Sequence, residues 1–372
     1  MRKMGRKIVL SNLLFILISL IGFSPSQGKE ATVTLIYSSN TLGEVEPCGT
    51  CPETGDNGGL ARRSQYIKTV KEEAKHLLIL DGGDALVMSY FERPSEREKA
   101  RRRAEVVLRL YEKIGYDALN IGDTDIGLGV EYLKKLQGDV NIPFLSANLK
   151  EKKTGKPVFK PYVMKEGEGV NIGILGLITT EISPHLQKEL RNYSIENPIK
   201  TAKETITRFM ASCDHIIALA HLTPPEIESL AKEVPRISII VGGNDRYFMF
   251  PKHFKHSLYV QTDAFGSHIG KLNLNLVKGA SEFRDVLPNT LLQQNIEKVR
   301  KRMEDPQFAK EMKNLKELEQ ALIEQKKRLP DPSGKNTYEN FLILMHPGME
   351  SDPEVERLIN SSRDQLKRPI PY

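Results

Sequence analysis

Cysteine is scarce in this sequence, and its scarcity excludes several kinds of metal and haem site. Three cysteines, Cys48, Cys51 and Cys213, occur among the 372 residues. No second close pair accompanies the run CGTC at 48–51, so a four-cysteine zinc site is excluded. The absence of a C-x-x-C-H run excludes covalent c-type haem. For Cys48 and Cys51 four alternatives stay open: a tight disulfide, a redox pair, half of a metal site, or two free thiols. We expect Cys213 to be a buried thiol.

Long hydrophobic runs are missing as well. The apolar run Leu13–Phe23 is too short to cross a bilayer comfortably, but it follows four basic residues and precedes the small polar residues of SPSQGKE. This order is typical of a secretory signal peptide over residues 1–28, so we expect a periplasmic or secreted protein. The alternative is an uncleaved N-terminal anchor. In both cases we expect membrane contact only through this segment. Export permits thiol oxidation, which favours the disulfide between Cys48 and Cys51.

A large excess of positive charge is also lacking. The formal net charge is +6, but four basic and no acidic side chains lie in residues 1–28, so the expected mature chain carries +2. A nearly neutral chain does not support a basic face for binding a nucleic acid duplex. We therefore expect no nucleic acid partner.

What the sequence does contain is an alternation of short apolar runs and amphipathic stretches from residue 31 to residue 278. Runs rich in Val, Ile and Leu predict strands that are buried on both faces, as in sheets flanked by helices. The predicted strands lie at 33–39, 77–84, 117–123, 142–149, 171–179, 215–222 and 237–244. Helices are predicted between them at 60–74, 99–115 and 197–212. These patterns indicate an α/β fold.

The pattern changes after residue 278. Apolar residues recur at spacings of three and four from Leu292 to Leu322, with an interruption near Asp305, and predict a long amphipathic helix or a helical hairpin. A strand is expected at 337–345 and a last short helix at 352–366. We therefore divide the chain into a signal at 1–28, a main domain at 31–278 and a mostly helical C-terminal extension at 279–372.

Polar side chains follow six of the predicted strands. In open α/β sheets the ends of the strands are where ligands usually bind. Each polar residue taken alone is more often a turn residue or a helix cap, but six such positions favour a common site. These residues are Asn40, Asp84, Asp123, Asn148, His221 and Asn244.

Seven segments in order resemble the calcineurin-like metallophosphoesterases, and specifically the catalytic domain of secreted 5′-nucleotidases. They are GGLARRSQYI, LLILDGGDAL, GYDALNIGDTDIGLGVEYL, IPFLSANL, GVNIGILGLIT, DHIIALAHL and ISIIVGGND. The resemblance covers residues 31–278. It implies a four-layer β-sandwich flanked by helices, with two metal ions at the strand ends.

The resemblance also implies a division of the metal ligands, and this sequence departs from it. One ion would use the positions of Asn40, Leu42, Asp84 and Arg246, where leucine has no ligand atom and arginine is a fixed cation. We therefore expect that ion to be lost, with the Arg246 guanidinium close to Asp84 or Asp125 in its place.

The ligand set implied for the other ion is largely kept. That ion would use Asp84, Asp123, His221 and Asn244. Two carboxylates, an imidazole and an amide oxygen suit Mn, Mg, Ca or Zn. We therefore expect one divalent metal ion.

The implied catalytic residues differ too. Thr124 stands where the family has its catalytic histidine, and Asp125 stands where it has a glutamate. Asp125 and Arg246 are our candidate catalytic residues, Arg246 by neutralising phosphate. We expect an exported, metal-dependent phosphoesterase that is similar to 5′-nucleotidases, acts on small phosphomonoesters or nucleotides, and is weak because ligands are lost.

Two alternatives to a hydrolase stay open. One is a non-catalytic descendant of the fold that binds a ligand or a protein. The other is a thiol-redox or electron-transfer accessory that uses Cys48 and Cys51. The segment around CGTC is similar to an exported bacterial branch of the superfamily in which some members are linked to multihaem cytochromes, which implies a redox or cytochrome partner.

Overall fold

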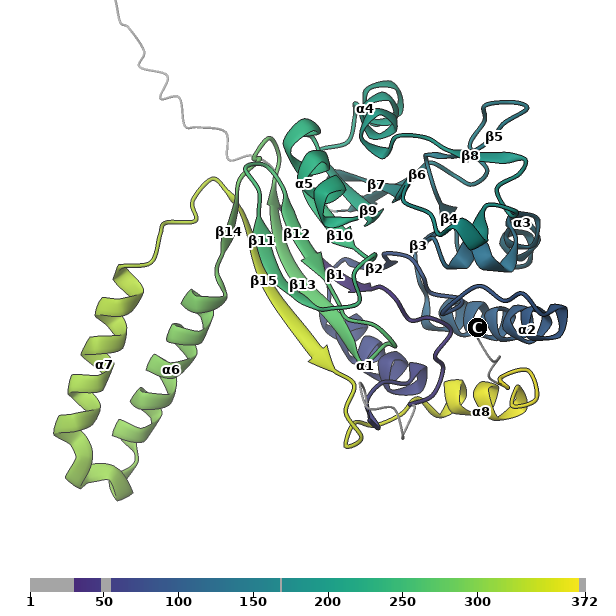
Figure 1. Cartoon of the computed structure of the whole chain (residues 1–372). Helices are drawn as coiled ribbons and strands as arrows, with labels where there is room; N and C mark the ends of the chain where they lie inside the picture. Colours follow the sequence, from purple (N-terminus) through teal and green to yellow (C-terminus); the bar gives the residue numbers. More distant parts are fainter. Residues whose placement is uncertain (1–29, 48–54, 168, 368–372) are drawn as a thin grey trace, which may run out of the picture.

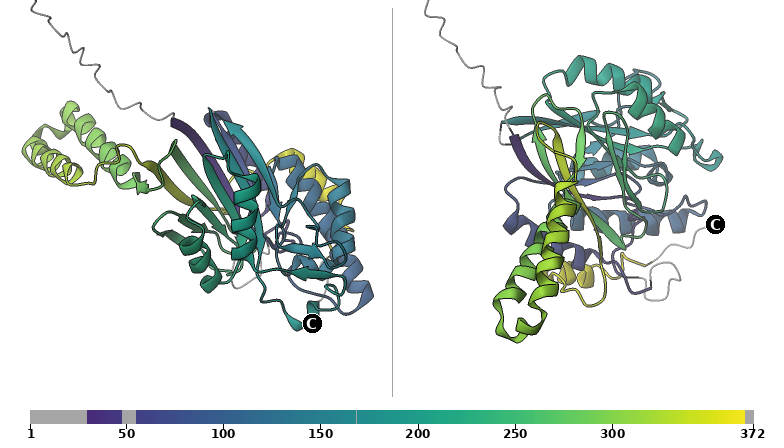
Figure 2. Two further views of the ribbon diagram at one scale, coloured as in Figure 1. Left: turned by 90° about the horizontal axis from the view of Figure 1, so that it is seen from above. Right: turned by 90° about the vertical axis from the view of Figure 1, so that its left-hand side faces the viewer.

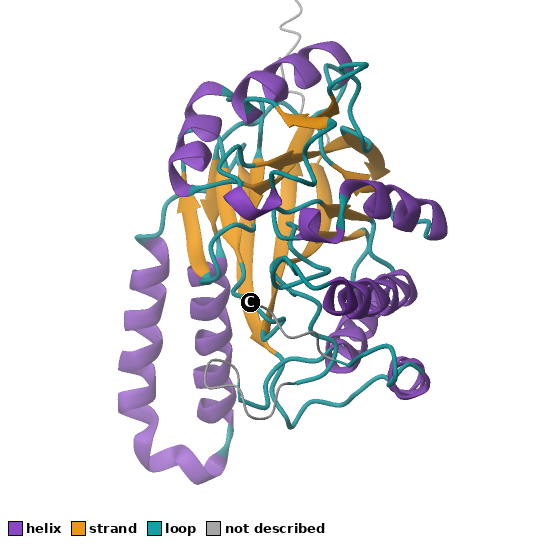
Figure 3. Cartoon of the chain, turned by 45° about the vertical axis from the view of Figure 1, so that its right-hand side comes forward, coloured by secondary structure: helices purple, strands orange, loops and turns teal. Residues whose placement is uncertain are grey.

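The computed structural model describes residues 30–47, 55–167 and 169–367. The strands form a seven-stranded sheet in the order β14-β15-β13-β1-β2-β3-β4, a six-stranded sheet in the order β11-β12-β10-β9-β7-β6, and the pair β5-β8. Figure 3 shows the strands in the centre and most helices on the outside. Figure 1 labels the elements along the chain.

The strands of the seven-stranded sheet mix two directions. Strands β1 to β4 run parallel to one another, β13 is antiparallel to β1, and β15 pairs with β13 and β14. The bounds are β1 Glu30–Ser38, β2 Leu77–Asp81, β3 Ala118–Asn120, β4 Phe144–Leu145, β13 His268–Val277, β14 Phe283–Asp285 and β15 Asn336–Leu344.

The six-stranded sheet has a parallel centre formed by β7, β9, β10 and β12, with β6 and β11 antiparallel at its two edges. Its bounds are β6 Tyr162–Gly167, β7 Val170–Ile178, β9 His215–His221, β10 Ile239–Gly242, β11 Met249–His253 and β12 Leu258–Gln261. The small pair comprises β5 Leu149–Glu151 and β8 Tyr193–Ile195.

Alternation along the central strands explains why they are buried on both faces. In β1, Val33, Leu35 and Tyr37 face the core between the two sheets. Ile36 faces the opposite core, which is covered by helices. Successive side chains of a strand point to opposite faces, so a strand between two apolar layers must be apolar throughout. This pattern confirms the α/β fold with two sheets between helical layers.

Helices cover both outer faces. α1, α2, α3 and α8 contribute to the core on the outer face of the seven-stranded sheet, whereas α4 and α5 cover the six-stranded sheet. The bounds are α1 Leu60–Glu73, α2 Pro94–Ile114, α3 Val130–Asp139, α4 Pro198–Phe209, α5 Pro224–Glu233 and α8 Pro353–Ser361. No helix in these described stretches is both long and apolar enough to span a bilayer.

The residues after 278 supply strands as well as helices. α6 Leu287–Glu304 and α7 Met312–Lys327 form a hairpin, interrupted by the short helix η3 Pro306–Glu311 where the sequence predicts a break. The hairpin projects from the sandwich in both views of Figure 2. β15 then returns to the seven-stranded sheet beside β13, and α8 contacts α1 and α2. The domain boundary at residue 278 stays a prediction.

The topology brings the predicted site residues to one edge. The carboxyl ends of β1, β2 and β3 lie together because these strands are parallel neighbours. The ends of β9 and β10 lie together in the facing sheet for the same reason. Ligands of α/β proteins bind at such an edge.

Candidate metal centre

Asp84 lies in the turn that follows β2, and its backbone is left-handed. Its φ is 55°, a conformation that aspartate tolerates better than most residues. The turn is held from both sides, since the Asp84 N–H donates to Asp125 Oδ2 at 3.1 Å and the Asp84 carbonyl accepts from the Leu42 N–H at 2.8 Å. The close neighbour is Gly122, where a Cβ would lie 2.0 Å from Asp84 Oδ1. Glycine at 122 is therefore required for this approach.

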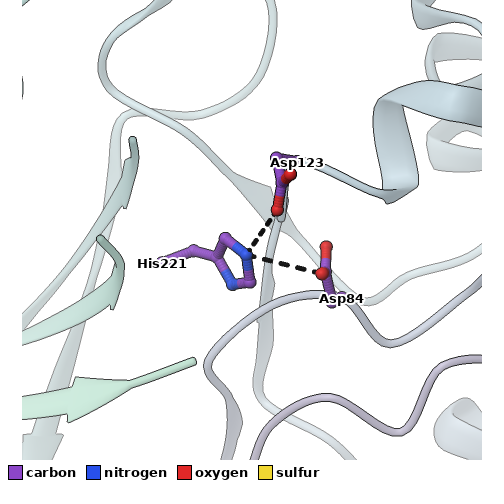
Figure 4. Close-up of side chains that lie close together, drawn as sticks. All are labelled: Asp84, Asp123 and His221. Carbon is purple, nitrogen blue, oxygen red and sulfur yellow. Dashed lines mark hydrogen bonds and ion pairs between the residues drawn. The ribbon is translucent and has the colours of Figure 1, made fainter. Parts of the chain in front are cut away.

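Asp123 and His221 converge on Asp84 from two other strand ends. Asp123 follows β3, and His221 is the last residue of β9. His221 Nε2 lies 2.8 Å from Asp123 Oδ1 and 3.4 Å from Asp84 Oδ2 (Figure 4). His221 is fully buried, whereas the Asp123 side chain is 21% exposed. The site is thus closed on the histidine side and open on the Asp123 side.

These groups shift one another's proton affinity. Burial raises the pKa of Asp84 to about 6, against the opposing charge of His221. Burial alone would lower the pKa of His221, but the charge of Asp84 and the hydrogen bond to Asp123 raise it to about 9. Burial also opposes ionisation of Asp123, but its hydrogen bond to His221 and the charges of His221 and Arg246 lower its pKa. Without a metal, His221 therefore carries a proton at neutral pH between two acidic groups.

The same three groups fit a divalent metal ion. One ligand atom each from Asp84, Asp123 and His221 lies within 4.8 Å of the others, the one such His/Cys/Asp/Glu group within the described residues. Carboxylate oxygen and imidazole nitrogen are ligands for Mn, Mg or Zn. His221 Nε2 faces both carboxylates, whereas the buried Nδ1 has no hydrogen-bond partner among the described residues.

Asn244 follows β10 directly beside this group. The preceding residue, Gly243, is close enough that a Cβ there would lie 3.1 Å from His221 Nδ1. The chain therefore passes the histidine ring immediately before Asn244, which is half-buried. A role for Asn244 as a fourth ligand stays a prediction.

The positions predicted for the other ion look different. Asn40 and Leu42 are buried and left-handed, with φ of 52° and 55°. The Asn40 amide donates to the carbonyl of Asp245 at 2.9 Å, and its Oδ1 is buried without a partner. Leu42 offers no ligand atom. These side chains together make no set of metal ligands.

Arg246 lies at the mouth of the site. Its guanidinium donates to the carbonyl of Met88 at 3.4 Å, and its charge helps lower the pKa of Asp123. Among the contacts of the described residues, the expected one with Asp84 or Asp125 is absent. The positive charge of Arg246 therefore acts on Asp123, the partly exposed carboxylate.

The side chains of two further predicted site residues form hydrogen bonds with backbone groups. Asp125 Oδ2 accepts from the N–H groups of Asp84 and Gly122, and its Oδ1 accepts from Leu86. Asn148 donates to the carbonyls of Ile178 and Glu196 and accepts from Ile178 N–H. Both side chains therefore fix loops. A catalytic role for Asp125 and a ligand role for Asn148 stay predictions.

The cysteine predictions have different outcomes. Cys48 and Cys51 lie outside the described residues, so their pairing stays a prediction. Cys213 is a buried free thiol, as expected. Burial raises its pKa, which makes it a poor nucleophile.

A buried polar network below the site was not predicted. Arg63 on α1 is 1% exposed and Asp81 at the end of β2 is fully buried. The tyrosines Tyr111 and Tyr116 stack between them with ring centroids 4.0 Å apart. The sequence does hold a signal, because Arg63 lies three or four residues from Leu60 and Ile67 and so interrupts the apolar face of its helix.

Comparisons with known proteins find similar sequences and structures among 5′-nucleotidases and calcineurin-like phosphoesterases. No family model matches the chain. A 5′-nucleotidase from Vibrio parahaemolyticus is 31% identical over 171 residues, which cover 44% of this chain and 29% of that protein. The snake venom 5′-nucleotidase of Gloydius brevicauda is 26% identical over 278 residues, 65% of this chain and 45% of that one. The chain thus spans less than half of these relatives.

A solved structure extends the similarity in fold over nearly the whole chain. The calcineurin-like phosphoesterase YfkN from Bacillus subtilis matches with a TM-score of 0.64 and 16% identity, over 91% of this chain and 98% of that one. At this identity the match concerns the fold alone.

Proposed function

Because the chain is homologous to 5′-nucleotidases and has the calcineurin-like phosphoesterase fold, we propose that it is a metal-dependent phosphoesterase. Its substrates are small phosphomonoesters or nucleotides. The observation that carries this proposal is the convergence of Asp84, Asp123 and His221 at the carboxyl ends of three strands.

One divalent ion is held by Asp84, Asp123 and His221, with Asn244 as the further ligand. When bound, the ion supplies a Lewis acid that polarises a phosphoryl oxygen. His221 must give up its proton to ligate, and the two carboxylates that now share that proton become free to ligate as well. The buried side of the group excludes water, and the open side at Asp123 admits the substrate.

Arg246 supplies fixed positive charge at that open side. It is exposed and influences Asp123, so an incoming phosphate can reach the guanidinium. Arginine recognises phosphate through paired N–H donors. We assign Arg246 to phosphate binding at the substrate entrance.

Turnover is slow in this proposal. Thr124 replaces the family's acid, and its hydroxyl donates to the carbonyl of Val87 at 2.8 Å. Its pKa is far too high for general acid catalysis at neutral pH. The leaving group must take its proton from water, which favours substrates with acidic leaving groups.

Export completes the proposal. The N-terminal signal directs the protein to the periplasm or the exterior, where metal and nucleotides are available. The segment lies outside the described residues, so the support is its sequence pattern.

The test is metal analysis of the purified protein together with a panel of phosphoesters. We expect about one divalent ion per chain and phosphatase activity that EDTA abolishes. Asp84→Asn should lower both metal occupancy and activity, the activity by at least about 100-fold, since a metal contributes several kcal/mol to transition-state stabilisation. Asp117→Asn is the matched control, because Asp117 pairs with Lys165 at the amino end of β3, opposite to the end that Asp123 follows.

Two results would overturn the proposal. A folded protein that binds no metal and hydrolyses no ester would favour a ligand-binding descendant, a function consistent with the occupied hydroxyl of Thr124. Activity that requires the Cys48–Cys51 pair but no metal would favour the redox alternative.

A further inference from the structure

The polar network below the metal centre joins the two loops that frame it. Arg63 Nη1 donates to Thr41 Oγ1 at 3.2 Å and to the hydroxyl of Tyr116 at 3.0 Å. The hydroxyl of Tyr111 lies 2.7 Å from Thr41 Oγ1 and 3.0 Å from Asp81 Oδ2. All five of these side chains are buried. We refer to them, with Ser38, as the anchor network.

One end of the network fixes the turn that carries Asp84. Asp81 Oδ1 accepts from the N–H of Gly83 at 2.9 Å, within the Asp-Gly-Gly-Asp turn. Its Oδ2 accepts from the Ser38 hydroxyl at 2.7 Å. Because Asp81 touches neither Asp123 nor His221, it acts on the site only through the turn.

The other end fixes the first loop at Thr41. This residue lies between Asn40 and Leu42, both of which have positive φ. The first loop in turn supports the second, because the N–H groups of Asn40 and Leu42 donate to the carbonyls of Gly83 and Asp84 at 2.9 and 2.8 Å. The two loops therefore form one unit that is tied to the network at both ends.

Three residues of this unit have disfavoured left-handed backbones, namely Asn40, Leu42 and Asp84. Such conformations persist only where the surroundings over-determine them. The network supplies that determination through hydrogen bonds between buried charged and hydroxyl groups, which are costly to bury without partners. Arg63 Nε is the buried atom of these side chains that has no partner in the part of the chain that the structure describes. A buried network with no ligand of its own, placed under a binding loop, indicates a positioning function.

We propose that Arg63, Asp81, Thr41, Tyr111 and Tyr116 are positioning residues that hold Asp84 in the conformation needed to ligate metal. This inference rests on the proposed metal-binding function. It extends that function to residues that touch neither metal nor substrate.

The sharpest test uses Thr41, where two substitutions separate shape from hydrogen bonding. Thr41→Val keeps the shape and removes the acceptor for Arg63 and Tyr111, whereas Thr41→Ser keeps the acceptor. Loss of outer contacts to metal ligands typically weakens metal affinity 10–100-fold, so we expect Thr41→Val to weaken Mn²⁺ binding about 10-fold. Thr41→Ser should stay within about twofold of wild type. Electron paramagnetic resonance of free Mn²⁺ measures both.

A matched control separates positioning from general destabilisation. Tyr37 is fully buried and its hydroxyl donates to Asn340 Oδ1 of β15 at 2.8 Å, on the other side of β1 from β2. Tyr37→Phe therefore removes one buried hydrogen bond without touching the network. It should lower the melting temperature about as much as Thr41→Val and leave Mn²⁺ affinity unchanged. Should Thr41→Val fail to fold, Tyr111→Phe replaces it in the same comparison.

A second measurement keeps this inference distinct from the proposed function. Amide resonances of Gly83 and Asp84 in the metal-free protein should shift in Thr41→Val and stay in place in Thr41→Ser and Tyr37→Phe. If wild type binds no Mn²⁺, the proposed function fails, and the amide shifts alone decide the positioning role. Unchanged amides, or equal Mn²⁺ affinity in the valine and serine variants, would overturn it.

Discussion

The candidate site has two halves, whose loops have similar backbone conformations but carry different side chains. The loop after β1 and the turn after β2 run side by side, joined by hydrogen bonds from Asn40 to Gly83 and from Leu42 to Asp84. In the acidic half, formed by Asp84, Asp123 and His221, ligand atoms converge. In the other half, formed by Asn40, Leu42 and Arg246 and called here the amide half, none do. The fold provides the loops, but residue type alone decides what each half can bind.

The halves also differ in how their charges are balanced. In the acidic half a protonated His221 lies between two carboxyl groups, so a proton holds the place that a metal can take. In the amide half Asn40 donates to a carbonyl, and positive charge comes from Arg246 at the rim. An arginine side chain does not lose its proton at accessible pH. The acidic half can therefore exchange its proton for a metal ion, whereas the positive charge of the amide half stays in place.

Rebuilding the amide half is the strongest way to break this comparison. The triple variant Asn40→Asp, Leu42→His, Arg246→His restores three ligand types around the existing Asp84. We expect metal content to rise from about one to about two ions, and phosphatase activity to rise about 100-fold, since a second cation adds several kcal/mol of transition-state stabilisation. Mass spectrometry of bound metal and initial rates measure the two effects.

The double variant that leaves Arg246 in place is the control. A guanidinium beside the new ligands repels a second cation, so the double variant should keep one ion. If it gains a second ion as readily as the triple variant, Arg246 has no part in excluding metal.

The proton on His221 predicts that the stability of the metal-free protein depends on pH. The pKa of His221 is about 9 when folded and near 6.5 when unfolded. Because the folded state binds the proton more tightly, the stabilisation is complete below about pH 6.5 and is lost as the pH rises through 9. We expect the free energy of unfolding to fall on the order of 3 kcal/mol over this window. Urea denaturation in EDTA measures it.

Replacing two different histidines identifies the source of that slope. His221→Gln should flatten the curve between about pH 7 and 9. His215 is also buried, but burial lowers its pKa, so it titrates below the window and His215→Gln should keep the slope. A curve that stays steep without His221 would show that another group holds the proton.

Two aspartates two residues apart offer a finer comparison within the acidic half. Asp125 accepts three backbone N–H donors, whereas Asp123 is partly exposed and contacts His221. Asp125→Asn turns an acceptor into a donor that faces an N–H group, so we expect a loss of about 1–3 kcal/mol in unfolding free energy. Asp123→Asn should instead weaken Mn²⁺ binding, and it should cost little stability at a pH above about 9, where His221 is neutral. Equal effects of the two substitutions on both quantities would contradict this division.

Much of the architecture was predictable because it follows from local patterns. Continuous apolar runs predicted the central strands, and the helix predicted at 60–74 is observed at Leu60–Glu73. The break near Asp305 is also observed, between α6 and α7. The strand predicted at 142–149 was less accurate, since this segment forms β4 and the start of β5. Such short strands depend on partners that are distant in sequence.

The acidic half could be predicted, but the partners of the other polar side chains could not. Asp84 and Asp123 meet because β2 and β3 are neighbours, and His221 joins them from the end of β9 in the facing sheet. Asn148 and Asp125 also end strands or turns, yet both bind backbone groups. Which way such a side chain turns depends on loops from elsewhere in the chain. The anchor network was missed because its members lie far apart in sequence, from Ser38 to Tyr116.

The smallest effect is expected at the rim of the amide half, and it tests whether Arg246 serves substrate or structure. Arg246 is exposed, so its attraction for phosphate is screened by water. Exposed ion pairs contribute at most about 1 kcal/mol, and Arg246→Ala should therefore weaken phosphate binding to the Mn²⁺-loaded protein about fivefold. Calorimetry at low salt measures this, and added salt should shrink the difference. Lys255→Ala, which removes an exposed cation in the turn between β11 and β12 at the opposite end of the six-stranded sheet, should leave phosphate binding unchanged. If both variants weaken it equally, the attraction belongs to the net charge of the surface. A selective loss in Arg246→Ala would place the phosphate beside the guanidinium, at the open side of the acidic half.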